Sequence, residues 1–526
     1  MKTFLFLLGI TCVLASRTGG KIEELIDEFH RPTGDTIDLP HSDFYNPAVS
    51  KIEQFKTERE FHRPSVDKAE QFNEEHEFHT PSESEFQVPQ RQCREVITQF
   101  TESVDYSNLS IDELIQIASK HEGLEFLADA NATAAMGIDI NNLDPDLIAD
   151  AMATTYEFVR RRGYPAEIHR IQTSDRYCLE LHRIPGSPSS PPRPGKIPVY
   201  LQHGLLDSSA GWVIMGVNHS LGFILADLGY DVWLGNVRGN RYSRMHLDHD
   251  PDGRRGNRRR FWDFSWHHMG TIDLPAIIDY ITEVTGHQRM HYVGHSQGTT
   301  SFFVMCSMRP EYNNRILSGH MLAPIAFMGR LFSPFVRAAA LFQNSIDFGA
   351  SLLGIYEFLP NSDTMARLGQ AACRDDAFFQ SMCSNVLFLI GGFNSAQMNG
   401  TLLPVIMGHT PAGASTDQLI HYAQGIRSGN FRQFSFGAIT NLLRYGSINA
   451  PRYNLANIRA PLTLYYSLND WLADPRDVRE LFAGMSSRRK LIQITDPRFN
   501  HFDFIWAIDV KALLYDQLVE IMKEHE

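Results

Sequence analysis

A pentapeptide near the middle of the chain has the residue types and spacing of a nucleophilic serine on a sharp turn. Gly294-His295-Ser296-Gln297-Gly298 follows the apolar run 290–293 and precedes a helix-like run over 299–308. Bulky residues at the two glycine positions would collide with the strand or the helix, so the glycines allow the turn to form. The pattern predicts that the Ser296 hydroxyl projects from the end of a strand, where a base and a substrate carbonyl can both reach it.

A nucleophilic serine needs a base and an acid that orients the base, and both are expected downstream. In sheets that carry this type of turn, the order along the chain is Ser, then Asp or Glu, then His. Asp470 follows an apolar strand-like run, and His501 follows the last predicted strand. We expect His501 to accept the Ser296 proton and Asp470 to orient the imidazole. Asp474 is the competing acid, but it precedes Pro475 and is predicted to cap the following helix.

Acyl transfer also needs hydrogen-bond donors for the negative oxygen of the tetrahedral intermediate. One donor is expected to be the backbone N–H of Gln297, directly after the nucleophile. The second is expected in the loop after an early strand, and His203-Gly204-Leu205-Leu206 fits that loop. Gly204 lets the backbone approach, which makes the Leu205 N–H the predicted second donor. The alternative interpretation is an ordinary glycine between a strand and a loop.

From about residue 145 onward, short apolar runs alternate with helix-like runs. This alternation predicts a mainly parallel sheet with helices on both faces, and with the serine turn it predicts an α/β-hydrolase fold. Between about 325 and 450 the alternation breaks in a stretch rich in Phe, Leu and Gly, which is predicted to be an inserted helical cap or lid. The predicted strands are 199–202, 230–234, 291–293, 316–322, 462–466 and 491–494, and the predicted helices are 221–228, 272–284 and about 505–523.

The first 140 residues differ in composition from the rest. Residues 1–16 contain Lys2, an apolar run and small residues at the end, which predicts a secretory signal peptide too short to span a bilayer. Residues 17–90 are acidic and repeat a Glu-Phe-His motif; they are predicted to be a disordered extension, either a tolerated low-complexity segment or a propeptide or docking motif. Residues 91–140 are predicted to be a helical appendage, and residues 141–526 the hydrolase domain.

The chain has six cysteines, at positions 12, 93, 178, 306, 373 and 383. The first leaves with the signal peptide, so five remain, and at least one is unpaired or pairs between molecules. Cys373 and Cys383 are close in sequence and are predicted to pair. Cys178 and Cys306 lie in apolar runs and are predicted to be buried hydrophobic residues, whereas Cys93 receives no assignment.

Several features indicate the secretory route and limit the partners. Four glycosylation sequons lie at Asn108, Asn131, Asn218 and Asn399. With the signal peptide they predict a secreted or lysosomal protein. The net charge of −13 argues against nucleic acid as a partner. No later apolar run is long enough to predict a transmembrane helix, and the oligomeric state is not predicted.

Five sequence blocks resemble the acid lipase family, the animal gastric and lysosomal lipase group of the α/β-hydrolases. The resemblance covers roughly 145–526. It implies hydrolysis of triacylglycerols or sterol esters at an oil or membrane surface, by a serine mechanism without a metal or an organic cofactor. The blocks are residues 202–209, 230–240, 292–300, 472–475 and 500–507. By position, the family pattern implies the nucleophile Ser296, the acid Asp470, the base His501, the oxyanion donors Leu205 and Gln297, a disulfide between Cys373 and Cys383, and glycans at Asn218 and Asn399.

Three features depart from the family pattern. The acidic extension has no counterpart in it. The arginine-rich segment 254–260 is predicted to be a partly inserted loop, either an ordinary solvated loop or a protease site or anionic-lipid contact. Gly391 stands where vertebrate relatives often have a free cysteine, so the behaviour of that thiol is not expected here.

The leading hypothesis is therefore a lipase or sterol esterase, and two alternatives remain. The first is a catalytically silent lipid-binding or storage protein on the same fold, against which the intact serine, aspartate and histidine argue. The second is an esterase for small soluble esters, which does not need the long apolar cap. We further predict that part of residues 330–400 is a lid that opens at a lipid surface.

Overall fold

The computed structural model describes residues 93, 113, 116, 145–341, 355–359 and 390–526 of the 526-residue protein. Residues 87–526 form one compact unit. The predicted signal peptide and acidic extension lie outside the described residues. So do Asn108, Asn131, Cys373, Cys383 and most of the predicted lid. Within the predicted helical appendage, only Cys93, Glu113 and Gln116 are described, and all three are helical.

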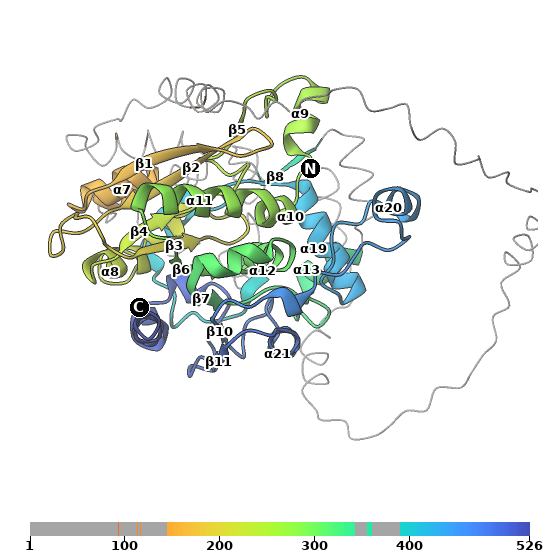
Figure 1. Ribbon diagram of the computed structural model, residues 1–526. Helices are drawn as coiled ribbons and strands as arrows, with labels where there is room; N and C mark the ends of the chain where they lie inside the picture. Colours follow the sequence, from red (N-terminus) through yellow and green to blue (C-terminus); the bar gives the residue numbers. More distant parts are fainter. Residues whose placement is uncertain (1–92, 94–112, 114–115, 117–144, 342–354, 360–389) are drawn as a thin grey trace, which may run out of the picture. The chain divides into compact units, whose positions relative to one another are not determined.

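A nine-stranded sheet lies at the centre of the described part of this unit (Figure 1). Its strand order is β1-β2-β4-β3-β6-β7-β10-β11, with β5 paired to β2. The strands from β4 to β11 in this order are parallel, whereas β1 and β2 are antiparallel to their neighbours. The bounds are β1 Glu167–Gln172, β2 Tyr177–Ile184, β3 Pro198–Gln202, β4 Asp231–Leu234, β5 Met245–His246, β6 Met290–His295, β7 Ile316–Leu322, β10 Leu462–Tyr466 and β11 Arg489–Gln493.

The central strands are buried along their whole length. Every residue of β3, β4, β6 and β10 is buried, which explains why these strands are continuous apolar runs in the sequence. In the register of the sheet, Gly294 of β6 lies opposite Gln202 of β3 and Met321 of β7. The parallel strands therefore end at one edge, and the loops that follow them meet there.

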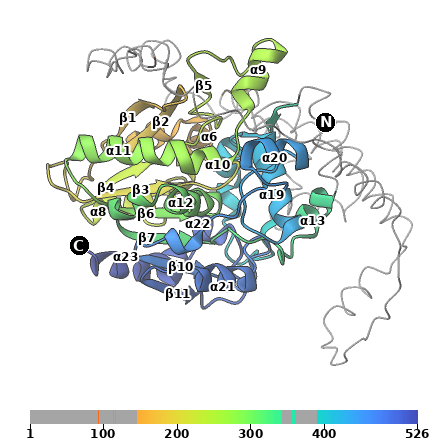
Figure 2. The same cartoon turned by 45° about the vertical axis from the view of Figure 1, so that its right-hand side comes forward.

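Helices α11 and α12 pack side by side, with α11 against β1 and α12 against β6, while α8 packs on β2 and β4 (Figure 2). No described helix has the length and apolar composition needed to cross a membrane. The helices outside the cap are α6 Pro145–Met152, α7 Thr155–Arg161, α8 Leu221–Asp227, α9 Arg255–Trp262, α10 Trp266–His268, α11 Leu274–Thr285, α12 Gln297–Met308, α21 Pro475–Gly484, α22 Asp503–Trp506 and α23 Asp516–Lys523.

The stretch between β7 and β10 contains helices and one small sheet among its described residues. Its helices are α13 Pro334–Leu341, α18 Leu403–His409, α19 Thr416–Ser428 and α20 Ala438–Tyr445, and β8 Glu357–Phe358 pairs with β9 Ala414–Ser415. Helix α13 packs on α19, and α18 packs on α6. This is the stretch in which the strand and helix alternation of the sequence breaks.

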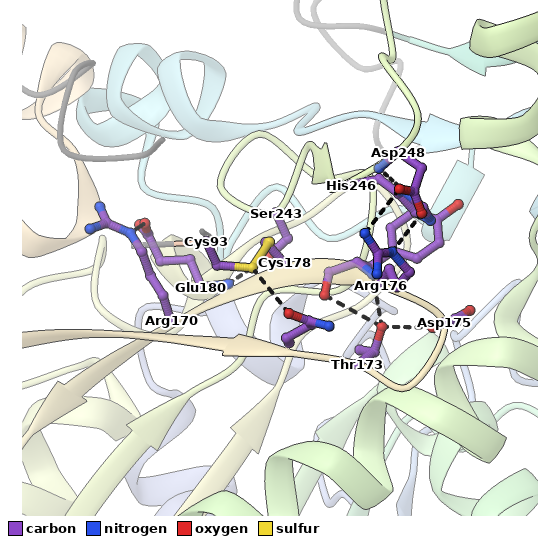
Figure 3. Close-up of a disulfide and its surroundings, with 12 residues drawn as sticks. Cys93, Arg170, Thr173, Asp175, Arg176, Cys178, Glu180, Ser243, His246 and Asp248 are labelled. Carbon is purple, nitrogen blue, oxygen red and sulfur yellow. Dashed lines mark hydrogen bonds and ion pairs between the residues drawn. A yellow bond between two sulfur atoms is a disulfide. The ribbon is translucent and has the colours of Figure 1, made fainter. Parts of the chain in front are cut away.

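The prediction that Cys178 is an isolated buried residue is wrong. Cys178 on β2 forms a disulfide with Cys93, with a distance of 6.0 Å between the Cα atoms (Figure 3). Both cysteines are 1% exposed, so the bond is part of the protein interior. Pairing cannot be deduced from spacing alone, and 85 residues separate these two positions. Cys306 is buried, as predicted, and forms no disulfide with another described cysteine.

Two predicted elements differ from the structure. The arginine-rich segment is not a loop but forms most of α9, which ends in the buried residues Phe261 and Trp262; arginine favours helix, and the two aromatic residues fix one end in the core. The predicted terminal helix is broken between α22 and α23. There, the N–H of Ile508 donates to the Gln397 carbonyl at 3.0 Å, so the backbone pairs with another segment instead of continuing the helix.

Candidate active site

Ser296 lies on a strained turn between β6 and α12. Its backbone angles are φ 51° and ψ −116°, a conformation that is costly for a residue with a side chain and that clusters at functional sites. A Cβ added to Gly298 would lie 2.3 Å from the carbonyl oxygen of Gln202, and one added to Gly294 would lie 2.9 Å from the carbonyl carbon of Gly298. Both glycines are therefore required by close packing, as the sequence predicts.

The structure brings the three predicted catalytic side chains into one chain of hydrogen bonds. Ser296 Oγ lies 2.8 Å from His501 Nε2. His501 Nδ1 lies 2.9 Å from Asp470 Oδ1 and 2.8 Å from Oδ2. The Asp470 and His501 side chains are 0% and 3% exposed. In this arrangement the carboxylate fixes the imidazole with Nε2 directed at the serine hydroxyl.

The two competing aspartates have different environments. Asp470 Oδ1 accepts the backbone N–H groups of Leu472 at 2.9 Å and Ala473 at 2.8 Å, which hold its carboxylate toward His501. Asp474 instead accepts the N–H of Arg476 at 2.8 Å and caps the N-terminus of α21. Asp474 is thus the helix cap that the sequence predicts, and Asp470 is the aspartate that contacts the histidine.

Gly391 connects the loops that carry Asp470 and His501. Its carbonyl accepts the N–H of His501 at 3.1 Å and the N–H of Trp471, next to Asp470, at 3.3 Å. A Cβ at position 391 would lie 2.6 Å from the Phe502 ring and 3.1 Å from His501 Cβ. A cysteine side chain would therefore displace the turn that carries His501, which gives a physical reason for the glycine at this position.

Asp503 stabilises the turn that carries His501, a role that the sequence analysis did not identify. Its carboxylate accepts the N–H of Asn500 at 2.7 Å and the side-chain amide of Asn394 at 2.8 Å. Burial raises the pKa of Asp503 to about 6, although these hydrogen bonds lower it. Asn500 Oδ1 in turn accepts the N–H of Phe502 at 2.8 Å. The turn is therefore closed by side chains from both of its ends.

His295, directly before Ser296, links the strand end to His501. Its Nε2 lies 2.9 Å from the carbonyl oxygen of His501, so Nε2–H is the donor. Burial lowers the pKa of His295 to about 3, with a further contribution from the nearby His501. The side chain is therefore neutral, and its Nδ1 has no hydrogen-bond partner among the described residues. The Gly-X-Ser-X-Gly pattern leaves this position unspecified, so the motif does not predict this contact.

The loop predicted to supply an oxyanion donor lies beside Ser296. A Cβ added to Gly204 would lie 3.2 Å from Ser296 Cβ, which places Gly204 in close contact with the serine and Leu205 one residue farther along. Gln297 is the first residue of α12, and its side-chain amide donates to Gln418 Oε1 of α19 at 2.8 Å. Both predicted donors therefore belong to segments that adjoin Ser296.

His203 holds this loop in place through both ring nitrogens. Nδ1 lies 2.7 Å from the Gly204 carbonyl and acts as the donor, while Nε2 accepts the N–H of Val237 at 3.2 Å. Asn240 Nδ2 lies 3.3 Å from the same Nε2. Burial lowers the pKa of His203 to about 4, so it stays neutral and keeps an acceptor for these donors. The sequence block 230–240 thus supports the loop through buried hydrogen bonds.

The remaining predicted sites are partly described. Asn218 is exposed and Asn399 is half-buried, so the Asn218 side chain is accessible to a glycan. The Asn399 side-chain oxygen accepts the N–H of Thr401 at 3.1 Å. Within the described ranges, no three or more His, Cys, Asp or Glu side chains form a group that could hold a metal ion.

Comparison with known proteins agrees with this architecture. The chain matches the family profiles described as a partial alpha/beta-hydrolase lipase region, over residues 155–216, and the alpha/beta hydrolase fold, over residues 197–507. Lipase 3 of Drosophila melanogaster is 42% identical over 378 residues, which are 70% of this chain and 93% of that protein. Lipase 1 of Drosophila melanogaster is 41% identical over 378 residues, 71% of this chain and 80% of that protein.

A vertebrate relative matches over a similar length of the chain. Gastric triacylglycerol lipase of Bos taurus is 38% identical over 379 residues, 71% of this chain and 92% of that protein. These matches cover most of each relative. Because sequence identity of this extent accompanies the α/β-hydrolase fold, the chain belongs to the acid lipase family and is a carboxylic ester hydrolase.

Proposed function

We propose that the protein is a secretory-pathway serine hydrolase that cleaves the carboxylic esters of neutral lipids, triacylglycerols or sterol esters, through an acyl-enzyme on Ser296. The observation that carries this proposal is the unbroken hydrogen-bond chain from Ser296 Oγ through His501 to Asp470. It begins on a strained turn that holds the serine hydroxyl at the edge of the sheet. This combination of nucleophile, base and orienting acid is what acyl transfer requires.

In the acylation step, Ser296 Oγ attacks the ester carbonyl carbon while His501 Nε2 takes the hydroxyl proton. The N–H groups of Leu205 and Gln297 are the proposed donors to the negative oxygen of the tetrahedral intermediate. When the intermediate collapses, the bond to the leaving alcohol breaks and His501 transfers the proton to that alcohol. Asp470 accepts the Nδ1–H throughout and stabilises the charged imidazole.

In the deacylation step, a water molecule replaces the alcohol. His501 accepts one proton from the water as its oxygen attacks the acyl carbon. Collapse of the second intermediate releases the fatty acid and returns the proton to Ser296 Oγ. The reaction thus consumes one water molecule per ester, and the proposed residues suffice for the proton transfers.

Two observations support the substrate class and the secretory route. The bovine relative is named for triacylglycerol, which favours a neutral lipid ester here. The Cys93–Cys178 disulfide is typical of proteins that fold in an oxidising compartment, and the sequon at Asn218 is exposed. Both secretion and a lysosomal destination agree with these features.

The decisive experiment compares emulsified trioleoylglycerol, cholesteryl oleate and a short soluble ester as substrates of the purified full chain. The Ser296→Ala variant serves as the control for contaminating hydrolases. We expect turnover of at least one of the two lipid esters, lost in the variant. Turnover of the short ester alone would favour the esterase alternative. Absence of turnover with every ester would contradict the proposal and favour a silent lipid-binding protein.

A further inference from the structure

Helix α20 exposes its apolar side chains and buries a polar one. Asn441 is the buried residue of the helix, at 1% exposure. Ile439 and Leu443 are 80% and 83% exposed. A surface helix of a globular protein normally buries its apolar stripe and leaves polar residues in water. Helix α20 has the opposite orientation, with its apolar side chains in water and its polar Asn441 buried.

Asn441 fixes this orientation through three hydrogen bonds. Its side-chain nitrogen donates to Ser435 Oγ at 2.9 Å and to the Ile448 carbonyl at 3.0 Å. Its side-chain oxygen accepts the N–H of Phe436 at 2.9 Å. One side chain thus ties the segments before and after the helix together. The apolar side is therefore held toward solvent by specific contacts, and a simple rotation of the helix would break all three.

The exposed apolar residues of α20 and the turn after it form one group, here called the α20 patch. Single exposed apolar residues are normal on protein surfaces, but a group within one short segment marks an interaction site. Positions 439, 442 and 443 have the spacing that places side chains on one helix face. The patch consists of Ile439, Leu442, Leu443 and Ile448, which are 80%, 53%, 83% and 61% exposed.

The charge of this segment limits the kind of partner. Between residues 437 and 450, Arg444 is the one charged residue. Its guanidinium lies 4.0 Å from the centroid of the Phe436 ring, so it packs over an aromatic face of the same segment. A polyanionic partner would need a cluster of cations. An apolar patch with a single charge instead matches the uncharged acyl-chain region of a lipid surface.

The patch is connected to the candidate active site through α19. The Gln424 side chain of α19 donates to the Ser435 carbonyl at 2.9 Å and accepts the Ser435 N–H at 2.8 Å. At the other end of α19, Gln418 contacts the Gln297 side chain beside the nucleophile. Figures 1 and 2 both show α20 next to α19, on the side away from α8. Attachment at α20 would therefore hold the helix that adjoins the nucleophile at the lipid surface.

We propose that the α20 patch is a lipid-surface attachment site, which inserts its four apolar side chains into the acyl-chain region of an oil droplet coated with phospholipid. The inference rests on the proposed hydrolysis of lipid esters, because an enzyme for soluble esters has no need of such a surface. Attachment is driven by burial of apolar side chains. It therefore depends on these side chains and only weakly on salt, since one cation contributes little electrostatic attraction.

The experiment measures attachment separately from hydrolysis. The full chain with Ser296→Ala is mixed with trioleoylglycerol droplets coated with phosphatidylcholine, and the bound fraction is determined by flotation. Ile439→Gln with Leu443→Gln removes the two most exposed side chains and keeps residues that favour helix. The matched control is Leu228→Gln, because Leu228 is 49% exposed and follows α8, which lies away from α20 in Figures 1 and 2.

We expect the double variant to partition onto droplets on the order of 100-fold more weakly, because loss of each buried aliphatic side chain weakens partition about tenfold or more. The control should bind like the parent. With Ser296 intact, both variants should hydrolyse a short soluble ester at the parental rate, which shows that they are folded. Raising NaCl from about 0.05 to 0.5 M should change droplet binding less than threefold.

Three results would overturn the proposal. The first is unchanged droplet binding by the double variant. The second is a parent dimer in sedimentation that the double variant dissociates, which would assign the patch to contacts between copies of the chain. The third is a loss of binding in high salt, which would indicate electrostatic attachment elsewhere. Failure of the proposed hydrolase function is a separate result, since it would appear as no ester turnover by the protein with Ser296 intact.

Discussion

The edge of the sheet that carries Ser296 and the surface of helix α20 follow opposite rules. At the sheet edge, polar side chains are buried and hydrogen-bonded to one another, as in the contacts of His501, Asp470 and His203. At α20, one buried amide holds the helix while aliphatic side chains remain in water. Chemistry needs fixed positions, which buried strand ends supply. Contact with a partner needs an accessible surface, which α20 supplies.

Because of this difference, substitutions at the sheet edge and at α20 should have different effects on turnover. A change at the sheet edge should alter turnover of every ester, soluble or emulsified, because the same atoms act on each. A change at α20 should alter only reactions at a lipid surface. The following predictions test the sheet-edge side of this comparison.

The largest effect is expected for Ser296→Ala. Loss of the nucleophile should reduce kcat on the order of 10⁶-fold with the soluble ester and with the emulsion alike, as for other serine hydrolases. Thermal unfolding should change little, since the hydroxyl contributes one hydrogen bond, to His501. Steady-state kinetics and calorimetry measure the two quantities. Turnover within tenfold of the parent would refute the assignment of Ser296.

Asp470→Asn and Asp474→Asn form a matched pair. Asp470→Asn should lower kcat roughly 10⁴-fold, because an amide no longer stabilises the charged imidazole and favours the wrong tautomer. Asp474→Asn should leave kcat within about tenfold and cost at most about 1 kcal/mol of stability, because asparagine also caps helices. Kinetics on the soluble ester compare the two. If Asp474→Asn were the more damaging, the catalytic acid would be Asp474.

A smaller effect is expected for Gly391→Ala. The added methyl would meet the Phe502 ring, and the shift would move the carbonyl that binds the loops of both His501 and Trp471. We expect a loss of about 1–3 kcal/mol in the free energy of unfolding and lower kcat with all esters. Gly256→Ala on α9 is the control, since among the described residues its added Cβ meets no atom within 4 Å beyond the adjacent residues and the backbone of its own helix. Equal stability of the two variants would contradict the crowding at position 391.

The parallel part of the fold was predictable because its strands are buried on both faces. The predicted strand 316–322 coincides with β7, and 462–466 coincides with β10, since their apolar runs have no other interpretation at that length. The hairpin of β1 and β2 was missed. The half-buried strand β1 contains Glu167, His169 and Arg170, and this polar composition conceals it in the sequence.

The candidate site was predictable where a motif or a strand end specifies it, as for Ser296, Asp470 and His501. The residues that support the site were not. His295 occupies a variable position of the turn motif, and Asp503 acts through contacts with Asn394, more than 100 residues away in the chain. The Cys93–Cys178 bond was missed for the same reason, because its partners meet only in the folded protein. Long-range contacts of this kind leave no periodic signal.

A buried acid in the loop that contains Leu205 makes the stability of the protein depend on pH. Asp207 is 5% exposed, and burial raises its pKa from 3.8 to about 7, although the Ser208 N–H and the Thr410 hydroxyl lower it. The folded protein therefore keeps a proton that the unfolded chain releases above pH 3.8. The resulting stabilisation is complete below about pH 3.8 and is lost as the pH rises toward 7.

Asp207→Asn should remove this pH dependence, because asparagine carries no charge in either state. We expect the stability of the variant relative to the parent to increase between pH 4 and pH 8, measured by thermal unfolding at a series of pH values.

The buried His203 and His295, whose pKa values are lowered to about 4 and 3, lose stabilisation in the opposite direction, as the pH falls below 6.5. They are present in both proteins and cancel in the difference. Asp263→Asn, which makes the same change at an exposed position, is the control. If the difference for Asp207→Asn did not exceed that for the control, Asp207 would be ionised in the folded protein at all these pH values. Residues 437–450 contain no Asp, Glu or His, so droplet binding at α20 should stay constant over the same pH range. A change of pH should therefore affect the loop that contains Asp207 and leave α20 unchanged.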